Sequence, residues 1–106
     1  MKDLNFFFNP SSIAVIGASD IVGSVGYEIM KNLIEDFPGK LYPINIKQKL
    51  IFGQPSFKSI LDVPHKVEMA VIAISAPYVA DTLEECGKKG VKGVVIVSGG
   101  FSEIGE

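Results

Sequence analysis

The chain has 106 residues, of which 47% are hydrophobic and 21% charged, and its formal net charge is −2 at pH 7. Residues 1–106 suffice for one small domain, and the slightly acidic balance, with no basic run, argues against a protein held to nucleic acid mainly by charge. A single cysteine rules out an internal disulfide and favours a reducing cytoplasm, and no apolar run approaches the roughly 20 residues that a membrane helix needs.

The first part of the chain predicts a buried strand, an amphipathic helix and a second strand. Residues 13–17 form a continuous apolar run that ends in glycine, which is typical of a strand buried on both faces of a parallel sheet. Over residues 24–36 apolar side chains recur every fourth position, and Pro38-Gly39 ends this helical pattern. Residues 41–45 then predict a short second strand.

The segment after the second strand is mixed in character. We expect a short extended piece near residues 51–53 and a single helical turn near residues 56–61. Residues 69–74 predict a third buried strand and residues 93–97 a fourth.

A helix is expected between these last two strands, over residues 77–88. Pro77 suits its first turn, Gly90 suits a left-handed cap, and Leu83 and Cys86 lie on the stripe that should face the sheet. The chain stops shortly after the fourth strand, so we expect it to be the N-terminal piece of a longer protein. The outer edge of the fourth strand should then be covered by a neighbouring chain, or the isolated piece should be only marginally stable.

The order of elements predicts an α/β fold, a Rossmann-like doubly wound parallel sheet with right-handed crossovers. The expected strand order is 3-2-1-4, which places the third strand outside the second. Ligands in such sheets bind beyond the carboxyl ends of the strands at the switch point, here expected between the first and fourth strands.

The first loop, residues 17–26, has the composition of a phosphate-binding turn. Gly17 lets the chain leave the strand sharply, Gly23 and Gly26 let backbone approach an anion, and the helix start supplies N–H groups and a positive dipole end. Ser19 and Ser24 add hydroxyl groups. The alternative is a glycine-rich turn that binds nothing.

The second loop distinguishes between nucleotides. An NAD site places Asp or Glu at the end of the second strand to accept from the ribose hydroxyls, but this position holds the neutral Asn45, followed by Lys47 and Lys49. A cation there suits an additional phosphate, such as that of NADP or the 3′-phosphate of coenzyme A. The alternative is a pair of solvated lysines.

A resemblance rests on five stretches: FFNPSSIAVIGAS, GSVGYEIMKNL, YPINIK, AVIAISAPYV and ECGKKGVKGVVIVSGGFSEIGE. Together they are similar to the N-terminal coenzyme A-binding domain of ADP-forming acetyl-CoA (acyl-CoA) synthetases, which is related to the alpha subunit of succinyl-CoA synthetase. The resemblance covers essentially the whole chain.

The resemblance implies which residues meet coenzyme A or acyl-CoA. Residues of the first loop would wrap the phosphates, Lys47 would meet a phosphate, residues after the third strand would line the adenine and pantetheine side, and residues after the fourth would guide the pantetheine arm. The full expected set is Gly17, Ala18, Ser19, Val22, Gly23, Ser24, Val25, Gly26, Asn45, Lys47, Ser75, Ala76, Pro77, Val97, Ser98 and Gly99.

Two positions depart from the succinyl-CoA enzymes. The first loop is longer here, so residues 19–21 lack a secure counterpart, and Gly99 stands where those enzymes carry a glutamate.

The resemblance implies a domain that binds coenzyme A but is not catalytic alone. Downstream ligase domains or a partner subunit, in an oligomer, would carry the reaction acyl-CoA + ADP + phosphate = acid + CoA + ATP. A regulatory domain of a protein lysine acetyltransferase is the alternative, and an NAD(P)-dependent reductase is disfavoured by Asn45. His65 is expected at the surface and Cys86 in the core, with no metal site.

Overall fold

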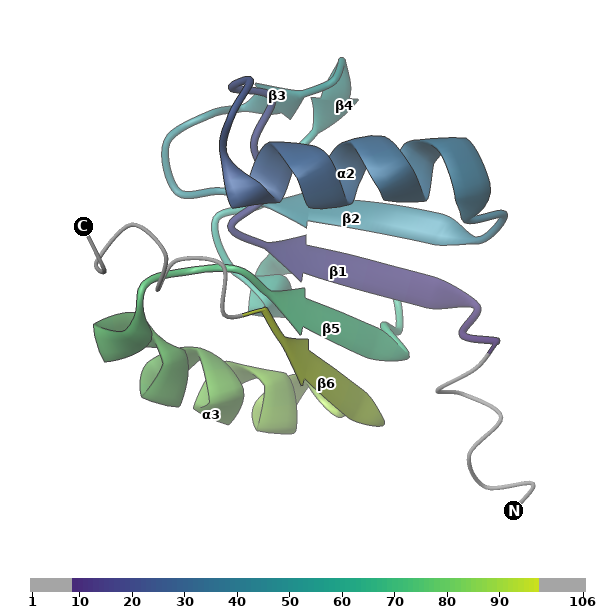
Figure 1. Ribbon diagram of the computed structural model, residues 1–106. Coiled ribbons are helices and arrows are strands. Elements are labelled where there is room, and N and C mark those ends of the chain that lie inside the picture. The colour runs from purple at the N-terminus through teal and green to yellow at the C-terminus, as the bar shows by residue number, and fades with distance from the viewer. Residues whose placement is uncertain (1–8, 98–106) are drawn as a thin grey trace.

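The computed structural model describes residues 9–97, in which four parallel strands form one sheet with a helix on each face (Figure 1). The strands are β1 (Ser12–Ile16), β2 (Lys40–Ile44), β5 (Met69–Ile72) and β6 (Gly93–Ile96), and the helices are α2 (Val25–Asp36) and α3 (Val79–Lys89). The predicted α/β fold and doubly wound parallel sheet are therefore confirmed, with strand and helix bounds within a few residues of those expected.

The predicted strand order is wrong. The observed order is β2-β1-β5-β6, so the strand at Met69–Ile72 pairs with β1 instead of lying outside β2. The switch point is consequently between β1 and β5, not between β1 and the last strand.

Pro43 supplies a physical reason for this order. It lies in β2 opposite Val15 of β1, and because proline has no N–H, a strand that contains it is suited to the edge of a sheet. The predicted order would have placed β2 in the interior. In the structure the outer side of β2 is met only near its end, where the Phe57 N–H donates to the Pro43 carbonyl at 3.0 Å.

Hydrogen bonds at the opposite end of the sheet hold β5 beside β1. The buried Ser12 hydroxyl donates to the Lys66 carbonyl at 3.2 Å and accepts from the Glu68 N–H at 2.9 Å. The Glu68 carboxylate in turn accepts from the Ser11 N–H at 2.7 Å.

Alternate residues of β1 point into two cores. Ile13 and Val15 face α2 and pack with Met30, whereas Ala14 and Ile16 face α3 and pack with Cys86. All six side chains are at most 7% exposed. This two-sided burial explains why the strands are continuously apolar.

The helices begin and end near the residues that the sequence predicts. The packing of α3 differs from the prediction at one residue, Leu83. Ser24 caps α2, its hydroxyl accepting from the Tyr27 N–H at 3.1 Å, and Gly90 ends α3 at φ 85°. Pro77 lies in a short 3-10 turn that precedes α3. Leu83, expected to face the sheet, is 39% exposed, because α3 packs mainly through Val79 and Cys86.

The mixed segment forms a small hairpin and a 3-10 turn. β3 (Leu50–Ile51) and β4 (Gln54–Pro55) pair in antiparallel fashion, and the helical turn covers Ile60–Asp62. Figure 1 shows the hairpin above the start of α2, and the fully buried Ile51 packs into the α2-side core. Within residues 9–97 no helix has the length and apolar character needed to cross a membrane.

Candidate functional site

The turn after β1 makes a close backbone contact with the residue that follows β5. Gly17 has φ 94°, and a Cβ atom built on it would lie 2.4 Å from the Ala73 carbonyl oxygen. Only glycine satisfies both the backbone conformation and this approach. The expected role of Gly17 as the exit from the strand is thus matched by its geometry.

The first turn of α2 packs equally closely on this exit. A Cβ atom on Gly26 would lie 2.0 Å from the Gly17 carbonyl oxygen. Beside this contact lies a pocket of about 180 Å³, lined by Gly17, Ser24, Val25, Gly26, Ala73, Ile74, Ser75 and Val97. The positive end of the α2 dipole is at this pocket, which favours an anion.

The hydroxyl groups of both loop serines make hydrogen bonds within the chain, which the sequence did not indicate. The Ser24 hydroxyl donates to the Ile21 carbonyl at 2.8 Å while it caps α2. The Ser19 hydroxyl accepts from the Ile21 N–H at 2.9 Å. Both side chains therefore shape the loop, and Ser24 has already used its proton within the chain.

A larger cavity of about 590 Å³ opens on the α3 side of the same strand ends. It shares Gly17, Ile74 and Ser75 with the smaller pocket, so the two sites are contiguous. Its floor is made by isoleucines of the strands and of the 3-10 turn. The remaining wall residues are Asn45, Ile46, Lys47, Lys58, Tyr78, Asp81, Thr82 and Glu85.

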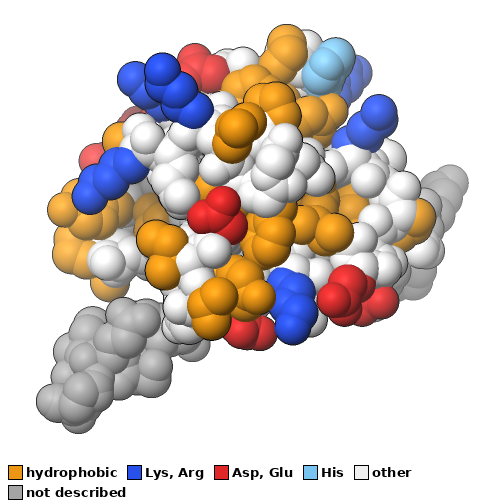
Figure 2. Space-filling view, turned by 90° about the horizontal axis from the view of Figure 1, so that it is seen from above, with side chains coloured by type: hydrophobic (Ala, Val, Ile, Leu, Met, Phe, Trp, Pro, Cys, Tyr) orange, Lys and Arg blue, Asp and Glu red, His pale blue; other side chains and the backbone are white. Residues whose placement is uncertain are grey.

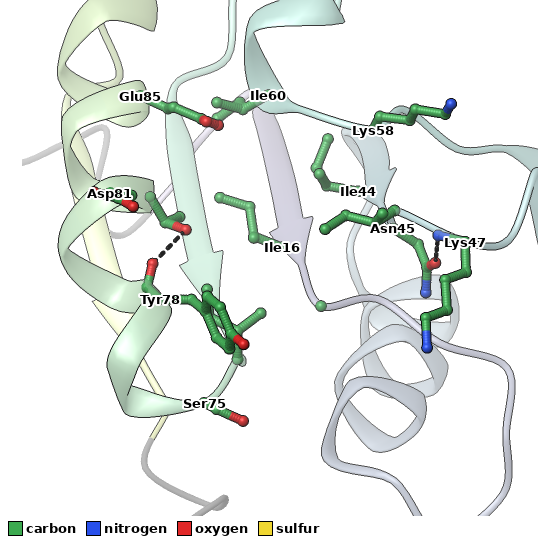
Figure 3. A pocket seen from close by; sticks show the side chains of 14 residues that line it. Ile16, Ile44, Asn45, Lys47, Lys58, Ile60, Ser75, Tyr78, Asp81 and Glu85 are labelled. Carbon is green, nitrogen blue, oxygen red and sulfur yellow. Dashed lines mark hydrogen bonds between the residues drawn. The ribbon is translucent and has the colours of Figure 1, made fainter.

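Charges of opposite sign stand on opposite walls of this cavity. Figure 3 shows Lys47 and Lys58 on the β2 side and Asp81 and Glu85 on α3. Glu85 accepts a hydrogen bond from the Ser59 hydroxyl at 2.8 Å. The β2 wall is accordingly suited to an anionic group and the α3 wall to hydrogen-bond donors such as an amine. On the molecular face in Figure 2, acidic, basic and apolar side chains are interspersed.

Asn45 links the first two loops. Its amide nitrogen donates to the Ala18 carbonyl at 2.8 Å, and its amide oxygen accepts from the N–H groups of Lys47 at 2.7 Å and Gln48 at 2.8 Å. An aspartate here would lose the donor and place a carboxylate against the Ala18 oxygen. The neutral residue at the end of β2 therefore has a structural cause.

Half of the expected site residues line one or both pockets. These are Gly17, Ser24, Val25, Gly26, Asn45, Lys47, Ser75 and Val97. Ala18 is fully buried behind the loop, and Ser19, Val22, Gly23, Ala76 and Pro77 lie outside both linings, with Val22 77% exposed. Ser98 and Gly99 lie outside the described residues.

The cavity also contains residues that the sequence analysis did not select. These include Tyr78 from the 3-10 turn before α3, then Asp81, Thr82 and Glu85 on one face of α3, and Ile16, Ile44 and Ile74 at the strand ends. Asp81 and Glu85 are four residues apart, and this spacing could have indicated that both lie on the same face of the helix. The isoleucines at the strand ends could be predicted from the sequence only as core residues, not as residues that line a cavity.

The one cysteine and the one histidine of the chain line neither pocket. Cys86 is buried in the α3-side core as expected, and desolvation raises the pKa of its thiol to about 11. His65 is exposed, as expected, and stacks on Tyr42. Among residues 9–97 there is no group of three His, Cys, Asp or Glu side chains that could hold a metal ion.

Comparisons with known sequences identify the family to which the chain is similar. Residues 11–104 match the family described as the CoA binding domain. The chain is 48% identical to the acetate–CoA ligase [ADP-forming] II subunit alpha of Pyrococcus furiosus, over 97% of this chain and 22% of that protein. It is 54% identical to the acetate–CoA ligase [ADP-forming] of Methanocaldococcus jannaschii, over 97% of this chain and 14% of that protein.

Solved structures give the same result. The chain matches the acetyl-coenzyme A synthetase 1 of Ca. Korarchaeum cryptofilum, solved with phosphate and ADP, with a TM-score of 0.88 and 42% identity over 99% of this chain and 23% of that one. The chain thus spans less than a quarter of the length of these relatives. Since the family match extends over residues 11–104, the chain belongs to the family of CoA-binding domains.

Proposed function

We propose that the chain binds coenzyme A or acyl-CoA as the N-terminal domain of an ADP-forming acid–CoA ligase. The observation that carries the proposal is the pair of contiguous pockets at the switch point, one at the start of α2 and one beside Lys47. The high identity to ADP-forming acetate–CoA ligases supports the ligase assignment.

The two pockets suit the two ends of the nucleotide. The diphosphate fits the smaller pocket, where the first turn of α2 offers N–H groups. The adenosine with its 3′-phosphate fits the larger cavity, whose volume of about 590 Å³ is typical of small-molecule sites and whose β2 wall carries Lys47. The pantetheine arm then leaves past Val97.

The described residues bind and orient this ligand and transfer no group. The Cys86 thiol is buried, and its pKa of about 11 keeps it protonated at neutral pH. Acyl and phosphate transfer would belong to downstream domains or to a partner subunit. Two of the relatives are alpha subunits by name, which favours an oligomeric parent protein.

Lys47→Ala tests the ligand assignment. Coenzyme A carries the 3′-phosphate that dephospho-coenzyme A lacks, and a charge-assisted hydrogen bond contributes about 1.5–3 kcal/mol, so affinity for coenzyme A should fall about tenfold to a hundredfold. Affinity for dephospho-coenzyme A should change little. The measurement is isothermal titration calorimetry with coenzyme A, dephospho-coenzyme A and NAD.

Lys49→Ala is the matched control, because it removes the same charge from the same loop outside both pocket linings. NAD binding more tightly than coenzyme A to the wild-type chain would refute the proposed function. Equal losses for coenzyme A and its dephospho form would refute only the role of Lys47.

A further inference from the structure

The hairpin β3–β4 is tied to the glycine-rich loop by side chains that line neither pocket. Asp20, in the loop between β1 and α2, accepts from the Gln48 side-chain amide at 3.0 Å, and neither residue lines either pocket. Its other carboxylate oxygen accepts from the Phe52 N–H at 3.4 Å. One carboxylate thus joins the loop after β1 to both ends of the segment that carries β3.

Phe52 makes a second contact with the start of α2. Its ring stacks on Tyr27, with ring centroids 5.5 Å apart and an angle of 29° between the planes. Tyr27 is the residue whose N–H is capped by Ser24, in the turn that lines the smaller pocket. The tip of the hairpin therefore packs on the first turn of α2, which supplies Val25 and Gly26 to the smaller pocket.

The conformation of Phe52 is unfavourable for its residue type. It has φ 53°, the only positive φ outside glycine in the described part of the chain. This left-handed conformation suits Asn or Gly in a tight hairpin turn, whereas a bulky residue adopts it only when its surroundings hold it there. The Tyr27 ring and the Asp20 carboxylate are the groups that hold it.

The same network fixes the backbone that carries Lys47. The side-chain oxygen of Asn45 accepts from the N–H groups of Lys47 and Gln48, and Gln48 reaches Asp20. Movement of Asp20 relative to Gln48 would therefore displace the cation relative to the start of α2.

We propose that Asp20, Gln48 and Phe52 are positioning residues that hold Lys47 at a fixed place relative to the phosphate pocket, so that both phosphate groups of one coenzyme A molecule are met together. This inference rests on the proposed function and deepens it. None of the three lines either pocket, so their effect is on the preference of the site for the 3′-phosphate.

Gln48→Ala tests the proposal without changing the net charge. The ratio of affinities for coenzyme A and dephospho-coenzyme A should fall by about threefold or more, in the range of couplings between contacting residues, while affinity for dephospho-coenzyme A stays within about twofold. In the Lys47→Ala background the same substitution should leave the ratio unchanged, because the cation it positions is absent.

Two further variants complete the experiment. Phe52→Asn retains a residue suited to the left-handed turn and removes the stacking on Tyr27, so it should also lower the ratio in a hairpin that still forms. Gln54→Ala, on the same hairpin outside the network, should leave the ratio unchanged. Circular dichroism checks that each variant is folded.

The outcomes separate this inference from the proposed function. Equal weakening of both ligands by Gln48→Ala, or an unchanged ratio, would overturn the positioning role while coenzyme A binding stands. A wild-type chain that binds both forms equally would overturn it as well. Failure of the wild-type chain to bind coenzyme A would overturn the proposed function and this inference together.

Discussion

Gly17 and Gly23 have almost the same backbone conformation but different surroundings. Their φ angles are 94° and 97°, yet only at Gly17 would a Cβ atom meet a neighbour, at 2.4 Å from the Ala73 oxygen. Gly23→Ala should therefore cost only the left-handed penalty of about 1–2 kcal/mol, and Gly17→Ala about 1–3 kcal/mol more. Urea unfolding of the two variants measures the difference, and equal losses would show that the turn relaxes.

At the level of single residues, the sequence was informative where backbone geometry demands a residue type. Gly17 and Gly26 were identifiable because only glycine allows such close approaches after a buried strand. Asn45 was identified by position, but its bond to Ala18 joins residues 27 positions apart and has no local signature. Asp20 and Gln48 were missed for the same reason.

Glu68 joins the starts of three strands, and its titration should affect how they hold together. The Ser11 N–H donates to its carboxylate at 2.7 Å, and chiefly for this reason the pKa of Glu68 is lowered from its ordinary 4.5, with Lys92 of the turn before β6 adding a 3.7 Å ion pair. A lowered native pKa gives stability that is present above 4.5 and is lost as pH falls through the native value.

Glu68→Gln should accordingly flatten the acid dependence of the unfolding free energy. The amide does not titrate, so the variant should lose less stability than the wild-type chain as the pH falls below 4.5. Urea unfolding at several pH values measures this slope. Glu84→Gln, on the exposed face of α3, is the control, and parallel slopes for Glu68→Gln and wild type would contradict the expectation.

At the level of elements, periodicity predicted each strand and helix but not their neighbours in the sheet. The strands at 13–17 and 69–74 are equally apolar, and nothing in that pattern says which lies beside which. Pro43 and the Ser12–Glu68 hydrogen bond decide the order, the first by a missing donor and the second by a contact between residues 56 positions apart. Only the proline was visible in the sequence.

At the scale of the whole molecule, β6 is the last strand of the sheet and has one unpaired side among the described residues. Among the described residues β6 pairs only with β5, and Ile96 is 51% exposed on it. An unpaired apolar edge is a template for another strand, so the chain of 106 residues should self-associate as its concentration rises.

A charge placed on this edge should suppress that association. Ile96→Lys places a solvated cation beside the unpaired backbone, and natural sheets protect their edge strands in this way. Because the side chain that it replaces is exposed, the free energy of unfolding should change by less than about 0.5 kcal/mol. Lys92→Ala, which alters charge just before the strand, is the control. Light scattering across a concentration series measures the mass of each variant. A wild-type chain that stays monomeric at every concentration, with unfolding independent of concentration, would show that the edge is protected within the chain itself.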